Sequence, residues 1–138
     1  MSRYVLDASV VVKWYVPEIH SEHALRLRGR SHDLVAPEFL LIELANTLLK
    51  KVRRAEFADD QVMSALASAA DLLTFDSMTG LFTRTVEMAR QFARSIYDAL
   101  YVVLALEQRC PLITADRRLY DAIRPIFPAT MVWVEDIN

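Results

Sequence analysis

Glycine and cysteine are scarce in this sequence. The 138-residue chain has two glycines and one cysteine. So few glycines exclude a Gly-rich phosphate-binding loop and a dinucleotide-binding fingerprint, because both motifs need several glycines at fixed offsets. The single Cys110 has no partner for an internal disulfide, which is typical of a reducing compartment. We therefore expect a cytoplasmic protein held together by a hydrophobic core.

Long apolar runs and a strong net charge are also missing. The longest uninterrupted apolar run, Ala99–Leu106, is far shorter than the ~18 residues that a membrane span needs. Asp7 and Lys13 interrupt the N-terminal apolar stretch, so we expect neither a secretory segment nor a membrane location. The net charge of −2 and the pI of about 5.9 argue against broad, charge-driven binding of duplex DNA. They leave room for a nucleic acid substrate held locally by a few arginines.

Short apolar segments alternate with helical ones along the whole chain. Ser9 is placed to cap the first helix, and Pro37 suits the first position of a later one. The alternation predicts right-handed crossovers and a three-layer α/β fold in one domain, 1–138. Its sheet has four to five short, mostly parallel strands, flanked by helices on both faces. The predicted strands are 3–7, 34–36, 72–75, 112–115 and 131–134; the predicted helices are 9–15, 20–30, 38–51, 59–71, 80–94, 96–108 and 117–123.

Two acidic residues stand where predicted strands end. Asp7 follows the first strand, and Asp116 follows the strand 112–115. Ligands of open parallel sheets bind beyond the carboxyl ends of the strands, so both side chains are candidates for a site. Each is also a good helix N-cap, and taken singly capping is the better explanation.

Two further acids lie on predicted helices. Asp98 is the only internal charge of a segment, 96–106, that is apolar nearly all round and therefore buried. Ser95 and Asp98 have capping-box spacing, which explains an acid in the first turn but not a carboxylate on a buried face. Glu43 and Asn46 belong to a narrow polar stripe on an otherwise apolar helix, for which a solvated face is an equally good explanation.

Convergence of these four acids would have a chemical consequence. Two carboxylates about 4 Å apart repel by roughly 4 kcal/mol at an effective dielectric constant of about 20. Such a cluster needs a shared proton or a cation. Ligation by carboxylates without His or Cys favours Mg²⁺ or Mn²⁺, and these ions support phosphodiester chemistry.

Four segments together resemble the PIN-domain family. They are LDASVVVKW at 6–14, the helix that carries Glu43 and Asn46 after Pro37, YDALYVVLALE at 97–107, and LITADRRL at 112–119. Within that family the chain is similar especially to the VapC toxins of bacterial and archaeal toxin–antitoxin pairs. The resemblance covers residues 3 to about 134. It implies a parallel sheet with helices on both faces and one acidic pocket at its carboxyl edge.

The resemblance also implies roles for individual residues. Asp7, Glu43, Asp98 and Asp116 match the family's acidic quartet, which binds Mg²⁺ or Mn²⁺ and supports endonucleolytic cleavage of RNA. Further implications are a homodimer and a small antitoxin that holds the enzyme inactive. Candidates for substrate contact or support of the quartet are Ser9, Asn46, Thr114, Arg117 and Arg118, although plain surface charge explains each arginine slightly better.

Other interpretations stay open at this level. A free-standing PIN nuclease of RNA processing, or a PIN-like module that binds RNA or protein without cleavage, would have the same motifs. A receiver domain is disfavoured because it normally has a pair of acids after its first strand. A haloacid-dehalogenase-like phosphatase would have a second Asp where Ser9 stands. The basic run 50–54 suits a helix C-terminus, with RNA or antitoxin contact as the alternative.

Overall fold

A five-stranded parallel sheet forms the centre of the computed structural model, which describes residues 2–29 and 31–137. The strand order is β3-β2-β1-β4-β5, and every neighbouring pair is parallel. This confirms the predicted sheet. The strands are β1 (Ser2–Leu6), β2 (His32–Pro37), β3 (Thr74–Asp76), β4 (Leu112–Thr114) and β5 (Met131–Trp133).

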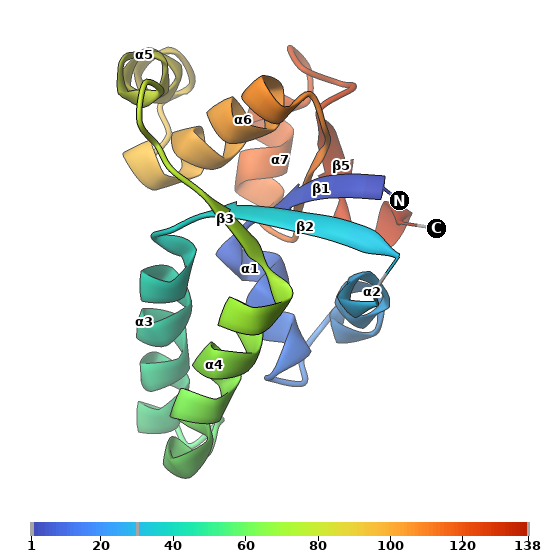
Figure 1. Ribbon diagram of the computed structural model, residues 1–138, viewed down its shortest axis with the longest axis vertical. Helices are drawn as coiled ribbons and strands as arrows, with labels where there is room; N and C mark the ends of the chain where they lie inside the picture. Colours follow the sequence, from blue (N-terminus) through green and yellow to red (C-terminus); the bar gives the residue numbers. More distant parts are fainter. Residues whose placement is uncertain (1, 30, 138) are drawn as a thin grey trace.

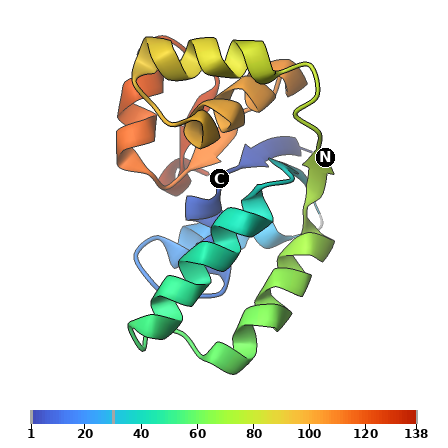
Figure 2. The ribbon, with the colours of Figure 1, turned by 90° about the vertical axis from the view of Figure 1, so that its left-hand side faces the viewer.

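Helices cover both faces of the sheet, which gives the predicted three layers (Figure 1). The helices of the N-terminal half lie on one side, and α3 and α4 form an antiparallel pair that extends away from the sheet (Figure 2). The helices α5, α6 and α7 lie on the other side. The bounds are α1 (Ala8–Val11), α2 (Ser21–Leu25), α3 (Leu40–Arg53), α4 (Val62–Leu72), α5 (Phe82–Phe92), α6 (Ile96–Gln108) and α7 (Arg117–Ile123), with short 3₁₀ turns η1 (Val12–Trp14), η2 (Arg26–Arg28), η3 (Asp59–Gln61) and η4 (Val134–Asp136).

The strand order places a reversal of direction at the middle of the sheet. From β1 the chain proceeds outward through β2 to β3, then returns to the other side of β1 for β4 and β5. Right-handed crossovers therefore put the connecting helices on opposite faces before and after the return. The carboxyl ends of β1 and β4 flank this switch point, which is where open parallel sheets bind ligands.

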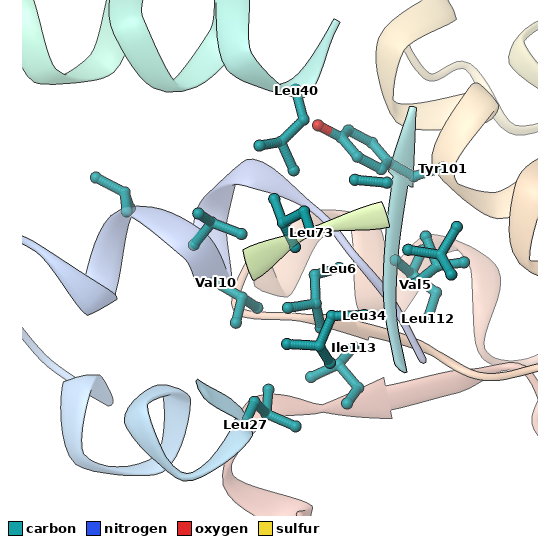
Figure 3. Packing of buried hydrophobic residues seen from close by; sticks show 14 of the residues in the cluster. Val5, Leu6, Val10, Leu27, Leu34, Leu40, Leu73, Tyr101, Leu112 and Ile113 are labelled. Atoms are coloured by element: carbon teal, nitrogen blue, oxygen red, sulfur yellow. The ribbon is translucent and has the colours of Figure 1, made fainter. Parts of the chain in front are cut away.

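The core joins the sheet to the helices on both sides. Leu6, Val10 and Ile113 are fully buried at its centre (Figure 3). The middle of α6 is buried because α6 lies between the strands and α5. None of the helices in the described part of the chain is long and apolar enough to cross a lipid bilayer.

Two local predictions were wrong. Asp7, not Ser9, is the N-cap of α1, because its carboxylate accepts a hydrogen bond from the backbone N–H of Val10. Pro37 is the last residue of β2, where it pairs with Asp76, and α3 begins only at Leu40. The fixed φ of proline suits both a strand and a first helical turn, and pairing with β3 selects the strand here.

Several boundaries also moved. The predicted helix 20–30 divides into α2 and η2, and residue 30 lies outside the described residues. The strand expected at 72–75 begins at Thr74, because α4 continues to Leu72. The helices α6 and α7 have the predicted bounds.

Candidate active site

One pocket of about 470 Å³ opens at the carboxyl edge of the sheet. It extends from the switch point along α3 as far as Lys50 and Lys51 in the last turn of that helix. The four acids singled out from the sequence, Asp7, Glu43, Asp98 and Asp116, all line it. The complete lining is Asp7, Ala8, Ser9, Val12, Lys13, Glu18, Glu43, Asn46, Thr47, Lys50, Lys51, Asp98, Tyr101 and Asp116.

Asp7 is the most buried of the four acids, with 5% of its surface exposed. Ser9 Oγ donates to Asp7 Oδ1 and Thr114 Oγ1 donates to Asp7 Oδ2, each at 2.5 Å. The backbone N–H groups of Ala115 and Asp116 donate in turn to these two hydroxyl oxygens, at 3.0 Å. Each hydroxyl oxygen accepts a hydrogen bond from the backbone and donates its own hydrogen to Asp7. Both of its oxygens are thereby fixed in position.

Burial dominates the protonation of Asp7. It raises the pKa of this carboxyl from 3.8 to about 7, although the hydrogen bonds from Ser9 and Thr114 lower it. The neighbouring charge of Asp116 contributes to this rise. A carboxylate at this position therefore lacks the positive charge that would offset its desolvation.

Glu43 and Asp98 bring acids from two helices to the same pocket. Burial raises the pKa of Glu43, and the charge of Asp98 adds to the effect. Burial also raises the pKa of Asp98, with Asp116 as the second cause, whereas Arg94 lowers it. Asp98, Asp116 and Glu43 therefore influence one another electrostatically, which is the convergence that the sequence could only suggest.

Tyr101 is a site residue that the sequence pattern concealed. Its hydroxyl donates to Glu43 Oε1 at 2.7 Å, across 58 positions of the chain. The ring packs edge-on against Phe39, and its hydroxyl end lies beside Leu40 at the start of α3 (Figure 3). Burial raises the pKa of Tyr101, so it remains a proton donor to Glu43. The available signal was its position three residues after Asp98, on the same side of α6.

Capping and pocket position coincide at the N-terminal ends of α6 and α7. Ser95 caps α6 by accepting from the backbone N–H of Asp98 at 3.0 Å. Asp116 caps α7, where its Oδ1 accepts from the backbone N–H groups of Arg118 and Leu119. The capping explanation of Asp116 is thus correct, and the same carboxylate still lines the pocket.

The remaining candidates divide into two groups. Ser9 and Asn46 line the pocket. Thr114 does not line it but donates a hydrogen bond to Asp7, which does. Arg117 lies with its guanidinium 3.9 Å from the centroid of the Trp133 ring, and neither it nor Arg118 is among the lining residues. Contact of these arginines with a substrate stays a prediction.

The candidate metal ligands, the four acids of the pocket, offer only oxygen atoms, but these atoms do not surround a single point. Among the described residues, 2–29 and 31–137, no three His, Cys, Asp or Glu side chains lie close enough together to hold a metal ion. The chemistry of the donors nevertheless suits a hard divalent cation, because carboxylate oxygens without nitrogen or sulfur are what Mg²⁺ and Mn²⁺ prefer.

Comparison with known proteins agrees with this architecture. The family model described as PIN domain matches residues 4–124, so the chain belongs to the PIN-domain family. The resemblance noted from the four segments is thereby confirmed. The receiver-domain and dehalogenase-like interpretations are excluded.

Individual relatives show to which group of PIN-domain proteins this chain is similar. The chain is 31% identical over 130 residues to the ribonuclease VapC3 of Pyrobaculum aerophilum, covering 92% of this chain and 96% of that protein. It therefore groups with the VapC ribonucleases. Among solved structures, PAE2754 from Pyrobaculum aerophilum matches with a TM-score of 0.72 at 19% identity, over 97% of this chain and 85% of the other.

A second structural match comes from a complex. It is VapBC-5 from Mycobacterium tuberculosis, a member of the VapBC family of toxin–antitoxin systems, with a TM-score of 0.59 and 19% identity. The match covers 96% of this chain and 98% of the other. At this identity the likeness shows a shared fold.

Proposed function

We propose that this chain is a VapC-type endoribonuclease, the toxin component of a toxin–antitoxin pair, and that it hydrolyses RNA phosphodiester bonds with Mg²⁺ or Mn²⁺ as cofactor. The observation that carries the proposal is the gathering of Asp7, Glu43, Asp98 and Asp116 in one pocket at the switch point. Kinship with the VapC ribonucleases supplies the reaction class.

Asp7, Asp98 and Asp116 are the residues that we expect to hold the metal. Burial raises the pKa of Asp7 and Asp98, and the charge of Asp116 raises both further, so a cation would relieve a cost that is already present. When bound, such an ion supplies a water of lowered pKa and polarises a phosphate oxygen. Glu43 either joins the ligands or accepts the proton of the attacking water, a role that its raised pKa suits.

The surrounding side chains hold these acids in place. Ser9 and Thr114 fix both oxygens of Asp7, and Tyr101 fixes one oxygen of Glu43. The contacts of Thr114 and Tyr101 join segments far apart in the sequence, so the pocket is assembled by long-range contacts. This fixed arrangement favours catalysis because the acids do not have to reorganise for every turnover.

Cleavage of RNA by matched variants tests the proposal. The wild type should cleave a single-stranded RNA in Mg²⁺ or Mn²⁺ and lose the activity in EDTA. Asp98→Asn should cut at background level and unfold at the same temperature as the wild type. Asp71→Asn removes an exposed carboxylate of α4 outside the pocket lining and should remain active. Equal cleavage by wild type and Asp98→Asn would reject the site. RNA binding without any cleavage by the wild type would favour a non-catalytic module.

Further expectations follow from kinship with a toxin–antitoxin system. We propose a homodimer of one-domain subunits in the cytoplasm, inhibited by a small VapB-like antitoxin. The match to a chain of a VapBC complex supports the antitoxin. Growth arrest on expression, relieved by co-expression of the adjacent small reading frame, is the expected result. Harmless expression of protein with demonstrated nuclease activity would argue instead for a free-standing RNA-processing enzyme.

A further inference from the structure

The pocket has a basic side as well as an acidic one. Lys13, Lys50 and Lys51 line it together with Glu18. Lys13 Nζ lies 3.0 Å from Glu18 Oε1, and Lys51 Nζ lies 3.1 Å from Glu18 Oε2. One carboxylate thus holds two lysines from different helical segments, one with each oxygen. Lys13 is itself buried, with 7% of its surface exposed.

Charge pairing dominates this side of the pocket. Burial alone would raise the pKa of Glu18, but the hydrogen bonds from Lys13 and Lys51 hold it below its usual range. The hydrogen bond to Glu18 is the main reason why the pKa of Lys51 is raised, and Glu56 adds to it. Three ammonium groups line this side of the pocket, and two carboxylates pair with them, Glu18 within the lining and Glu56 outside it. This side of the pocket therefore keeps a positive charge.

The acids and the lysines occupy different ends of the pocket. Glu43 and Lys50 are seven residues apart on α3, which places their backbones about 10 Å apart along the helix axis. Asn46 and Thr47 lie between them on the same face and also line the pocket. The lysines therefore stand beside the acidic end without belonging to it. A strand of RNA that presents one phosphate to the acids would pass its next phosphates along the lysines.

Support of the α3 dipole is the plain explanation for the basic residues near its end. It accounts for Lys50 and Lys51, which lie in the last turn. It does not account for Lys13, which comes from η1 and is buried against the same glutamate. Lys13 lines the same pocket from a second element and is paired with Glu18, so helix capping alone does not explain the basic side of the pocket.

We propose that Lys13, Lys50 and Lys51 form a subsite for an RNA backbone phosphate adjacent to the bond that is cut, with Glu18 as the positioning residue that holds two of them. The inference rests on the proposed ribonuclease function. Lysine binds phosphate as a point charge and is insensitive to base identity. The subsite therefore determines how a strand lies in the pocket and contributes affinity, while the acids perform the chemistry.

Kinetics of a double variant test the subsite. Lys50→Gln with Lys51→Gln should raise KM for a mixed-sequence single-stranded RNA roughly tenfold and leave kcat within about twofold. The dependence of log KM on log salt should become shallower by about 0.7 for each phosphate that the variant no longer neutralises. Arg53→Gln with Arg54→Gln is the matched control, because these exposed cations lie at the same end of α3 but outside the pocket lining.

A neutral linkage in the substrate gives a second, independent measurement. A methylphosphonate placed in turn on each side of the cleaved bond should raise KM for the wild type at one position. The double variant should show no further rise at that position, because the two changes remove the same interaction. Strictly additive effects at every position would overturn the subsite.

The outcomes separate the two proposals. A wild type that cleaves no RNA defeats the proposed function. A wild type that cleaves, beside a folded double variant with unchanged KM and salt dependence, overturns the subsite alone. The subsite is overturned even where the same variant weakens binding of a protein partner, since the lysines would then serve that partner and not the substrate.

Discussion

Replacement of Asp7 by asparagine should stabilise the protein while it abolishes activity. The folded chain without metal keeps a proton on Asp7 up to about pH 7, because burial raises its pKa from 3.8. The unfolded chain releases this proton near pH 4. Between those values the folded state binds more protons, so the free energy of unfolding contributed by Asp7 falls as the pH rises. Above about pH 7 the ionised carboxylate destabilises the fold fully.

The size of the effect follows from the shift. About three pKa units correspond to roughly 4 kcal/mol at most. The asparagine oxygen would still accept from the backbone N–H of Val10 and from the hydroxyl of Ser9, which both donate to Asp7 Oδ1. Its NH₂ group would take the place of Asp7 Oδ2, which accepts from Thr114, so that one hydrogen bond must reverse. Loss of that arrangement costs about 1 kcal/mol. We therefore expect Asp7→Asn to be more stable than the wild type by about 1–3 kcal/mol near pH 8, and no more stable near pH 4.

Urea unfolding in EDTA at both pH values measures this difference. Asp71→Asn, an exposed carboxylate at the end of α4, is the control and should change stability little at either pH. Added Mg²⁺ or Mn²⁺ should stabilise the wild type near pH 8, by about 2.7 kcal/mol at a hundredfold excess over Kd, and Asp7→Asn much less. A variant that is less stable than the wild type near pH 8, with an unchanged pH dependence, would refute the reasoning.

Three further predictions address the support of the site and the core. Tyr101→Phe keeps the packing on Phe39 but removes the donor to Glu43, and should lower kcat/KM about tenfold with thermal stability changed by less than about 1 kcal/mol; unaltered kcat/KM would contradict this. Thr114→Val removes a hydrogen bond that lowers the pKa of Asp7, so the acid limb of the pH–rate profile should move upward, and a downward move would count against it. Leu44→Ala, at a fully buried position of α3, should cost about 2–5 kcal/mol in urea unfolding, and a loss below about 1 kcal/mol would show that the site refills.

Local signals predicted the elements best where several of them coincide. Ser95 precedes an apolar helical pattern and does cap α6, and Asp116 does the same for α7. Both helices accordingly begin and end where the sequence indicates. Pro37 and Ser9 each obey a local rule that permits two structures. Pairing with β3 selects the strand conformation for Pro37, and Asp7 rather than Ser9 caps α1. Such choices depend on contacts between distant segments, which propensity does not contain.

The site divides in the same way. Asp7 and Asp116 follow strands, so a parallel topology alone brings them to one edge. Tyr101 looked like one more apolar residue of α6, since its hydroxyl meets Glu43 only after α3 has packed nearby. Glu18 lies outside the helices and strands, just after Pro17, where no periodic pattern marks it. Its two lysines come from η1 and from the end of α3, and only the folded chain unites them.

The geometry around Asp7 explains why its electrostatic cost persists. Leu6 precedes it at the end of β1 and Val10 follows within α1, and both are fully buried. The backbone on either side is thus anchored in the core, while both carboxylate oxygens are held by Ser9 and Thr114. Movement toward water would break all of these contacts at once. The negative charge of Asp7 must therefore be neutralised in its buried position, by a proton at low pH or by a cation at higher pH. For this reason a residue that destabilises the fold is suitable for binding a metal.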